Sequence, residues 1–172
     1  MIKNLTFFLW VLSSIVILFT AGCSQNMINE GGAVSQSAEW PRYNFSKLIS
    51  EKTDLVVLAE VSLIENVKDK VNENKQVQLS TLDVQEKYFG KESNSKIRLY
   101  QSVDKVKKNK RYLLFLEKVE GKDFYVVSDG NSQIEVKNNM VQIKIPQFEG
   151  EYTLDQFKAA FRTKLNELNL LN

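Results

Sequence analysis

The sequence predicts a mainly β domain of the α+β type, built as a curved antiparallel barrel of about six to seven strands. A short helix is expected before the strands and a longer amphipathic helix after them. Between residues 54 and 145, apolar runs rich in β-branched and aromatic residues alternate with turn residues, which is the pattern of short strands. After residue 153, apolar residues recur at helical spacing. An open antiparallel sheet with the final helix across one face is the alternative.

The first helix and the first strand follow one another closely. Asn44 can cap a short helix that runs to about residue 52 and shares an apolar face among Phe45, Leu48 and Ile49. The run 55–61 is too continuously apolar for an exposed strand. Its continuation to Val67 predicts one long strand that bends, as barrel strands do. Residues 68–76 are expected to form a solvated hairpin loop.

Three further strands are predicted in the middle of the chain. The second is marked by Val77, Leu79, Leu82 and Val84, and their alternation changes phase between Leu79 and Leu82, which predicts a bulge there. In the third, Ile97 and Leu99 point inward, with Gln101 a further candidate, and Arg98 and Tyr100 lie on the other face. The fourth, 112–116, is the most apolar run after the leader and should be central.

Turn residues separate the remaining strands. Gly121-Lys122 predicts a hairpin turn after which 124–127 pairs back, and Asp129-Gly130-Asn131 predicts another turn. Two more short strands, 134–136 and 140–145, are expected on either side of Asn138-Asn139.

The final helix carries the clearest signals in the sequence. Thr153 and Gln156 have the spacing of a capping box. One apolar stripe follows, made of Leu154, Phe157, Phe161, Leu165 and Leu168. Such a stripe could dock a partner, but packing onto the sheet is the commoner outcome.

The N-terminus predicts export and lipid anchoring. Lys3 precedes an apolar run at residues 5–20, which is short for a membrane-spanning helix and suits a signal peptide. Ala21-Gly22-Cys23 resembles the lipobox of bacterial lipoproteins, although Thr20 stands where leucine is usual. The resemblance implies transfer of a diacylglyceryl group to the Cys23 sulfur and cleavage between Gly22 and Cys23. An uncleaved signal anchor with an incidental cysteine is the alternative.

This reading divides the chain into three parts. Residues 1–22 are the signal peptide, 23–39 a lipidated, polar tether, and 40–170 a single extracellular β-rich domain. The expected location is the outer face of the cytoplasmic membrane of a bacterium, and the composition hints at a monoderm host. Because acyl chains such as palmitate anchor such proteins, the covalent diacylglycerol is the only attached group expected. The aromatics of Trp40-Pro41-Arg42-Tyr43 could form a ligand platform or, more commonly, pack on the domain edge.

Composition excludes several kinds of chemistry. The chain has no histidine, so Ser-His-Asp and Cys-His catalysis and histidine-ligated metal sites are excluded. Cys23 is the only cysteine, and its acylation leaves no thiol. After the leader, 22 basic residues face 21 acidic residues, which gives no field for attracting nucleic acid. No cofactor and no metal site are expected, and the carboxylates remain the only candidate catalytic groups.

The order of elements resembles that of a known fold family. The segments that carry the resemblance are 54–61, 82–86, 89–91 and 111–116, namely DLVVLAEV, LDVQE, FGK and RYLLFL. They are similar to the netrin-like, metalloprotease-inhibitor type of OB-fold domain over roughly residues 44–128. The resemblance implies an OB-like barrel. It implies no inhibitory residue, because those inhibitors use a free N-terminal cysteine within a disulfide framework.

One cluster of cations is a candidate contact with an anionic membrane or wall polymer: Lys105, Lys107, Lys108, Lys110 and Arg111. An ordinary solvated turn that keeps strands from aggregating is the alternative interpretation.

Three functions follow as hypotheses. The first is a non-enzymatic binding module, with another surface protein or a wall polymer as its partner. The second is a carboxylate-based enzyme acting on a cell-wall glycan, which needs two acidic side chains in one cleft. The third is a surface-exclusion or immunity lipoprotein.

Overall fold

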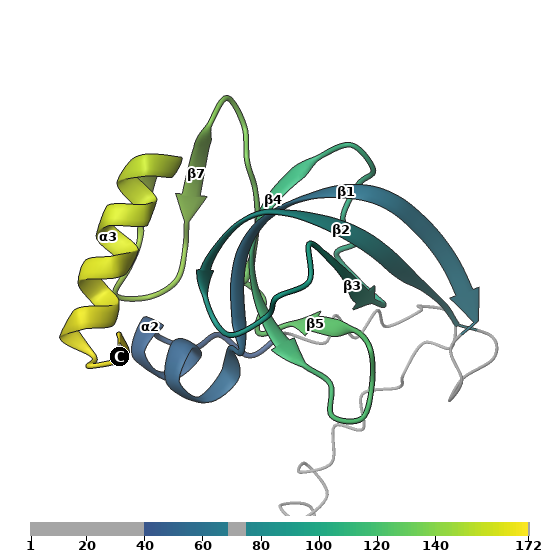
Figure 1. The fold of residues 1–172 in the computed structure, drawn as a ribbon, viewed down its shortest axis with the longest axis horizontal. Helices are drawn as coiled ribbons and strands as arrows, with labels where there is room; N and C mark the ends of the chain where they lie inside the picture. The colour runs from purple at the N-terminus through teal and green to yellow at the C-terminus, as the bar shows by residue number, and fades with distance from the viewer. Residues whose placement is uncertain (1–39, 69–74, 172) are drawn as a thin grey trace, which may run out of the picture. The chain divides into compact units, whose positions relative to one another are not determined.

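The computed structural model describes residues 40–68 and 75–171, which lie in one compact unit, Ala38–Asn172. Two helical segments and eight strands make up the described chain (Figure 1). In chain order they are α2 (Phe45–Lys47) continued by a π-helical turn (Leu48–Lys52), β1 (Leu55–Lys68), β2 (Gln76–Phe89), β3 (Lys96–Gln101), β4 (Arg111–Lys118), β5 (Tyr125–Val127), β6 (Gln133–Glu135), β7 (Met140–Ile143), β8 (Gly150–Thr153) and α3 (Leu154–Glu167).

Five strands close into a barrel. Their order is β1-β2-β3-β5-β4, and the additional pairing of β1 with β4 completes the circle. The predicted OB-like barrel is therefore confirmed, and the open sheet is wrong. One detail of the prediction needs correction, because β5 runs parallel to β3 where Leu99 faces Tyr125, whereas the other pairings are antiparallel.

The long apolar runs of β1 and β4 are explained by two cores that share these strands. Alternate residues of a strand point to opposite faces. In β1, Leu55 and Val57 point into the barrel, while Val56 and Leu58 point outward into a second core. In β4, Leu114 and Leu116 line the barrel, and Leu113 and Phe115 join the outer core. Because both faces are buried, neither strand shows the polar alternation of an exposed one.

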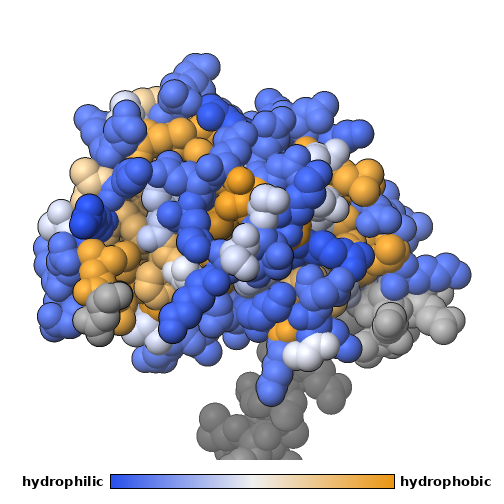
Figure 2. Space-filling view, in the orientation of Figure 1, coloured by the Kyte–Doolittle hydropathy of each residue, from blue (hydrophilic) through white to orange (hydrophobic). Residues whose placement is uncertain are grey.

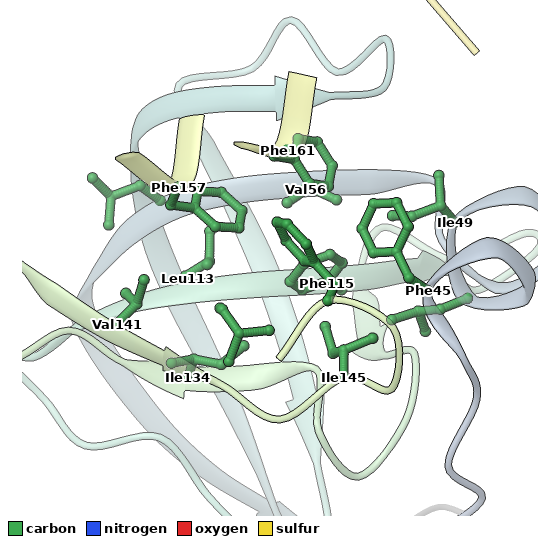
Figure 3. Close-up of a cluster of buried hydrophobic side chains, with 14 of the residues drawn as sticks. Phe45, Ile49, Val56, Leu113, Phe115, Ile134, Val141, Ile145, Phe157 and Phe161 are labelled. Atoms are coloured by element: carbon green, nitrogen blue, oxygen red, sulfur yellow. The ribbon is translucent and has the colours of Figure 1, made fainter. Parts of the chain in front are cut away.

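The outer core joins the two helical segments to the barrel wall (Figure 3). Phe161 of α3 contacts several rings, with centroid distances of 5.7 Å to Phe45, 6.0 Å to Phe115 and 5.3 Å to Phe157. The apolar stripe of α3 therefore packs on the sheet, as predicted. Both helix starts also match the sequence: Asn44 accepts a hydrogen bond from the Lys47 amide, and Thr153 and Gln156 form the capping box.

The predicted phase change within the second strand is wrong. Gln78, Ser80 and Leu82 of β2 pair opposite Gln101, Leu99 and Ile97 of β3, so the inward positions continue in one phase. The pairing of β1 with β2 shifts register at three places, and the shift nearest this segment lies in β1, between Val61 and Leu63. Two polar residues of β2, Gln78 and Ser80, face the barrel interior, and Val77 is also fully buried.

Hydrogen bonds explain these inward polar side chains. The Gln78 amide donates to the Ser80 hydroxyl at 2.9 Å and to the Val106 carbonyl at 2.8 Å. The Val106 amide in turn donates to the Gln101 side chain at 3.0 Å. A buried amide costs little when it is fully hydrogen-bonded, and this set fastens the β3–β4 loop across one end of the barrel. Hydrophobic alternation cannot reveal such a set.

One other difference concerns a single element. The strand β8, which pairs with β7 from Met140↔Thr153 to Ile143↔Gly150, was not predicted. Its four residues are polar or small apart from Tyr152, so it lacks a strand pattern. Among the described residues, no helix is long and apolar enough to cross a bilayer.

Candidate functional site

The predicted basic cluster lies on the β3–β4 loop and the start of β4. The loop is fixed to β1, since the Asn109 amide donates to the Val61 carbonyl at 2.9 Å and the Val61 amide donates to the Lys110 carbonyl at 3.0 Å. Asn109 takes a positive φ of 59°, as in a tight turn. The alternative interpretation of the cluster as a solvated turn agrees with this geometry.

The five cations do not converge on one point. Lys110 pairs with Glu135 at 3.5 Å, and the Arg111 guanidinium donates to the Asn139 side chain at 2.7 Å. Lys105 instead donates to the Gln76 carbonyl at 3.4 Å, at the far end of the β1–β2 pair. Lys107 and Lys108 are exposed and make no ion pair with the described residues. Two of the cations thus belong to the surroundings of β6 and β7.

Two acidic side chains line one cleft of the barrel domain. Asp54 and Glu92 both line a cleft of about 560 Å³ that also contains Tyr125, Lys118 and Gly90. However, both carboxylates are already engaged. Asp54 accepts the Lys118 backbone amide at 2.7 Å, and Glu92 accepts the Tyr125 hydroxyl at 2.7 Å.

The electrostatics of this cleft oppose acid catalysis. The hydrogen bond from Tyr125 is the largest cause that lowers the pKa of Glu92, and the backbone amides of Asn94 and Ser93 lower it further. A general acid needs a carboxyl whose pKa is raised. The lowered pKa of Glu92 therefore does not suit a general acid, and Asp54 accepts a backbone hydrogen bond at the end of β4. Within the part of the chain that the structure describes, no group of three acidic residues could hold a metal ion.

A second hollow is the better candidate for ligand binding. It is an open groove of about 590 Å³ between the hairpin strands β6 and β7. Its lining is rich in amides and charges: Gly130, Asn131, Gln133, Ile134, Glu135, Lys137, Asn138, Met140, Val141, Gln142, Lys144 and Glu151. This volume lies within the range of ligand sites in proteins. We call it the β6–β7 groove.

The groove exists because the hairpin splits directly after its turn. Asn138 and Asn139 both take positive φ values, 52° and 62°, which is the geometry of a tight hairpin turn. Lys137 and Met140 exchange two backbone hydrogen bonds, of 3.0 and 2.8 Å. Beyond this bridge β6 pairs with β4, whereas β7 pairs with β8. The hairpin stands above the barrel at the top of Figure 1, and β7 lies between the barrel and α3.

Charges in the groove are only partly compensated. Glu135 pairs with Lys110, but Lys137, Lys144 and Glu151 make no ion pair with any described residue. The groove therefore carries one more uncompensated cation than anion. On the face in Figure 2, hydrophilic side chains cover most of the described surface and hydrophobic ones form small separate patches. A polar ligand suits this surface better than an apolar one.

The end of the groove opposite the turn is fixed to the domain's lead-in. Asp129 is fully buried and accepts hydrogen bonds from the Tyr43 amide at 3.1 Å and the Asn131 amide at 2.8 Å. The Gly130 amide lies 3.4 Å from the Pro41 carbonyl. A Cβ at Gly130 would lie 3.0 Å from the Trp40 Cβ, so this residue packs closely on the domain edge.

Sequence reasoning placed the Asn138-Asn139 turn but did not identify the groove. The groove arises because β7 leaves β6 for β8, and β8 was itself not predicted. Cys23, the predicted lipidation residue, lies outside the described residues. No protein-family model matches the chain, and no curated protein is significantly similar to it.

Proposed function

We propose that the protein is a lipid-anchored, non-enzymatic binding module on the outer face of the bacterial cytoplasmic membrane, and that it binds its ligand in the β6–β7 groove. The observation that carries the proposal is the composition of this groove. Its two edges are the hairpin strands β6 and β7, and Lys137 and Lys144 line it without an ion-pair partner among the described residues.

Anchoring is the part of the proposal that rests on sequence. A short leader that ends in Ala21-Gly22-Cys23 favours acylation of the Cys23 sulfur, and two acyl chains on one residue give stable membrane attachment. Attachment would confine the groove to a thin layer next to the membrane. Even a weak site is then occupied by ligands in the same layer, because confinement raises the effective concentration.

Binding is favoured over hydrolysis by the state of the acidic cleft. Asp54 and Glu92 each hold a loop through hydrogen bonds, and the pKa of Glu92 is lowered rather than raised. A glycosidase needs one carboxyl that is protonated near neutral pH. Glu92, whose pKa is lowered, does not offer that property.

The anchor is tested by mass spectrometry of the protein from its native membranes. We expect a chain that begins at Cys23 and carries a diacylglyceryl group. The Cys23→Ala variant should carry no lipid and should not be held to the membrane by an acyl anchor. An intact leader or a bare sulfur on the natural product would overturn the anchoring.

The binding role is tested with two measurements. Purified residues 24–172 should show no turnover of cell-wall glycans or peptides; turnover would overturn the non-enzymatic role. In intact cells, a photo-crosslinking residue at exposed Gln142 in the groove should give a defined product. The same residue at Lys122, in the exposed turn after Gly121, is the matched control and should give none. If Gln142 and Lys122 gave equal amounts of crosslinked product, the groove would not be the binding site.

A further inference from the structure

We propose that the β6–β7 groove binds an extended acidic peptide segment of another protein, which adds as a strand to the free edge of β6. The proposal rests on the proposed function and names the ligand class of the same site. It is argued from the backbone groups and the charges that face the groove.

The outward edge of β6 has backbone groups with no strand partner among the described residues. The Val136 amide donates to the Arg111 carbonyl, and the Phe115 amide donates to the Ser132 carbonyl. In an antiparallel ladder, bonded and non-bonded pairs alternate. Because β6 and β4 pair in register, the N–H and C=O groups of Gln133 and Glu135 point away from β4 and toward the groove.

The facing edge of β7 has the same property. The Leu154 amide donates to the Asn139 carbonyl on the β8 side, whereas Met140 bonds to Lys137 on the β6 side. Alternation along β7 then assigns Val141 and Ile143 to β8 and turns the N–H and C=O of Gln142 toward the groove. Two strand edges with unpaired donors and acceptors thus diverge from one bridge.

Unpaired edges of this kind recognise another extended backbone. A peptide that lies beside β6 would exchange hydrogen bonds with Gln133 and Glu135 at the ordinary strand spacing of about 4.8 Å. This is the mode of strand addition, in which backbone bonds supply affinity and alternate side chains supply specificity. A glycan would leave these regularly spaced groups without matched partners.

The charges favour an acidic segment. Lys137 lies at the closed end of the groove, where it bridges to Met140. Lys144 lies four residues beyond Met140 along the β7 side. Four residues of strand span about 13 Å. A peptide with acidic residues at positions i and i+4 places both carboxylates on one face at this spacing. Glu151 is the single uncompensated anion of the lining, so it does not cancel both cations.

The test uses residues 24–172, which contain the complete barrel and both cores, and four synthetic peptides of three kinds. The probe is acetyl-Thr-Glu-Thr-Val-Thr-Glu-Thr-amide. The second peptide is N-methylated at alternate residues, in two versions that block one edge or the other. The third has Gln in place of both Glu residues. Binding is followed by amide NMR shifts up to millimolar peptide.

We expect the probe to shift the amides of Gln133, Glu135 and Gln142 and to slow their exchange with solvent. N-methylation on one edge should weaken binding about tenfold, and the Gln peptide should bind several-fold more weakly with a smaller dependence on salt. If both N-methylated peptides bound as tightly as the unmodified probe, strand addition would be overturned, but the proposal of a binding module would stand. The absence of amide shifts in the groove at millimolar probe would also overturn strand addition.

Matched variants separate the backbone from the side chain. Glu135→Pro removes the groove-facing amide without removing a β4 hydrogen bond, whereas Glu135→Thr removes the same carboxylate and keeps the amide. Glu135→Pro should bind the probe about tenfold more weakly than Glu135→Thr. Both must keep the wild-type amide spectrum outside the hairpin. Equal affinities would contradict the proposal, as would concentration-dependent dimers that pair β6 with β6 and exclude the probe.

Discussion

At the scale of single residues, Asp129 is the polar side chain on which the local fold depends most. It is fully buried and accepts three hydrogen bonds, from the Tyr43 amide, the Asn131 amide and the Ser132 hydroxyl. These bonds join the lead-in to the turn at one end of the β6–β7 groove. The carboxylate therefore acts as a structural acceptor.

We predict that Asp129→Ala lowers the free energy of unfolding by about 3 kcal/mol, because it leaves buried donors without an acceptor. Urea unfolding of residues 24–172 measures the change. Asp123→Ala is the control: Asp123 pairs with Arg98 at 2.6 Å, but its side chain is 71% exposed, so no measurable loss is expected. A similar loss in both variants would contradict the role of Asp129.

The Tyr125–Glu92 pair predicts a pH dependence of stability. Its hydrogen bond is the main cause that lowers the pKa of Glu92 in the folded protein. A lowered folded pKa stabilises the protein above the unfolded pKa of about 4.3, and this contribution is lost as the pH falls through the folded value. Tyr125→Phe should therefore lower stability at neutral pH, and the difference from wild type should shrink below about pH 4.3.

Urea midpoints measured across this pH range test the prediction. In the Glu92→Gln background, Tyr125→Phe should have an effect that does not change with pH, because no carboxylate remains to titrate. If the stability difference between wild type and Tyr125→Phe, both with Glu92 present, stayed constant with pH, Tyr125 would not act through the Glu92 carboxylate.

At the scale of elements, the end of β2 must pass very close to the start of β1. Gly90, directly after β2, has a φ of 94°, and a Cβ there would lie 2.1 Å from the Asp54 carbonyl oxygen. Gly121, in the turn after β4, also has a positive φ of 67°, but a Cβ there would meet nothing within 4 Å. Gly90 is therefore constrained both by its backbone conformation and by lack of space for a side chain, whereas Gly121 is constrained by its backbone conformation alone.

We predict that Gly90→Ala destabilises the protein by more than about 3 kcal/mol, since conformational strain and a backbone clash add. Gly121→Ala should cost only about 1 kcal/mol, from strain alone. Thermal and urea unfolding of both variants provide the measurement. Equal losses would mean that the barrel can open at Gly90 without cost.

The elements differ in how far the sequence predicts them. The run 112–116, the bent strand 55–67 and the helix from residue 154 were predicted correctly, because their apolar spacing reports burial directly. The inward Gln78 and Ser80 and the polar strand β8 could not be predicted, because hydrogen bonds and pairing partners place them. The same holds for the β6–β7 groove. The turn at Asn138-Asn139 can be predicted from the sequence. The sequence does not show that β7 pairs with β8 after this turn and not with β6.

The basic cluster illustrates the same limit for candidate sites. Five cations within seven residues suggested one anionic contact. In the fold, Lys110 and Arg111 turn to Glu135 and Asn139, while Lys105 turns to Gln76. These cations are separated because the β3–β4 loop turns at Asn109, which has a positive φ, between Lys105 and Lys110. Lys110 and Arg111 contact the hairpin that borders the groove, but neither residue lines it.

At the scale of the whole molecule, the barrel interior and the outer core cannot be lost separately without cost. They share β1 and β4, whose alternate residues serve one core each: Val57 and Leu114 inside, Val56 and Phe115 outside. The described domain should therefore unfold as one cooperative unit. This property keeps the hairpin that forms the groove on a rigid support.

We predict that Phe161→Ala in the outer core and Leu99→Ala in the barrel, both at most 1% exposed, each lower stability by about 3–4 kcal/mol and keep a single transition. Trp40, the only tryptophan after the leader, reports on the domain edge, and far-ultraviolet circular dichroism reports on the helix α3 and the strands. In both variants the two probes should give the same midpoint in urea. If Phe161→Ala released α3 first, circular dichroism would change before Trp40 fluorescence, and the two cores would be independent.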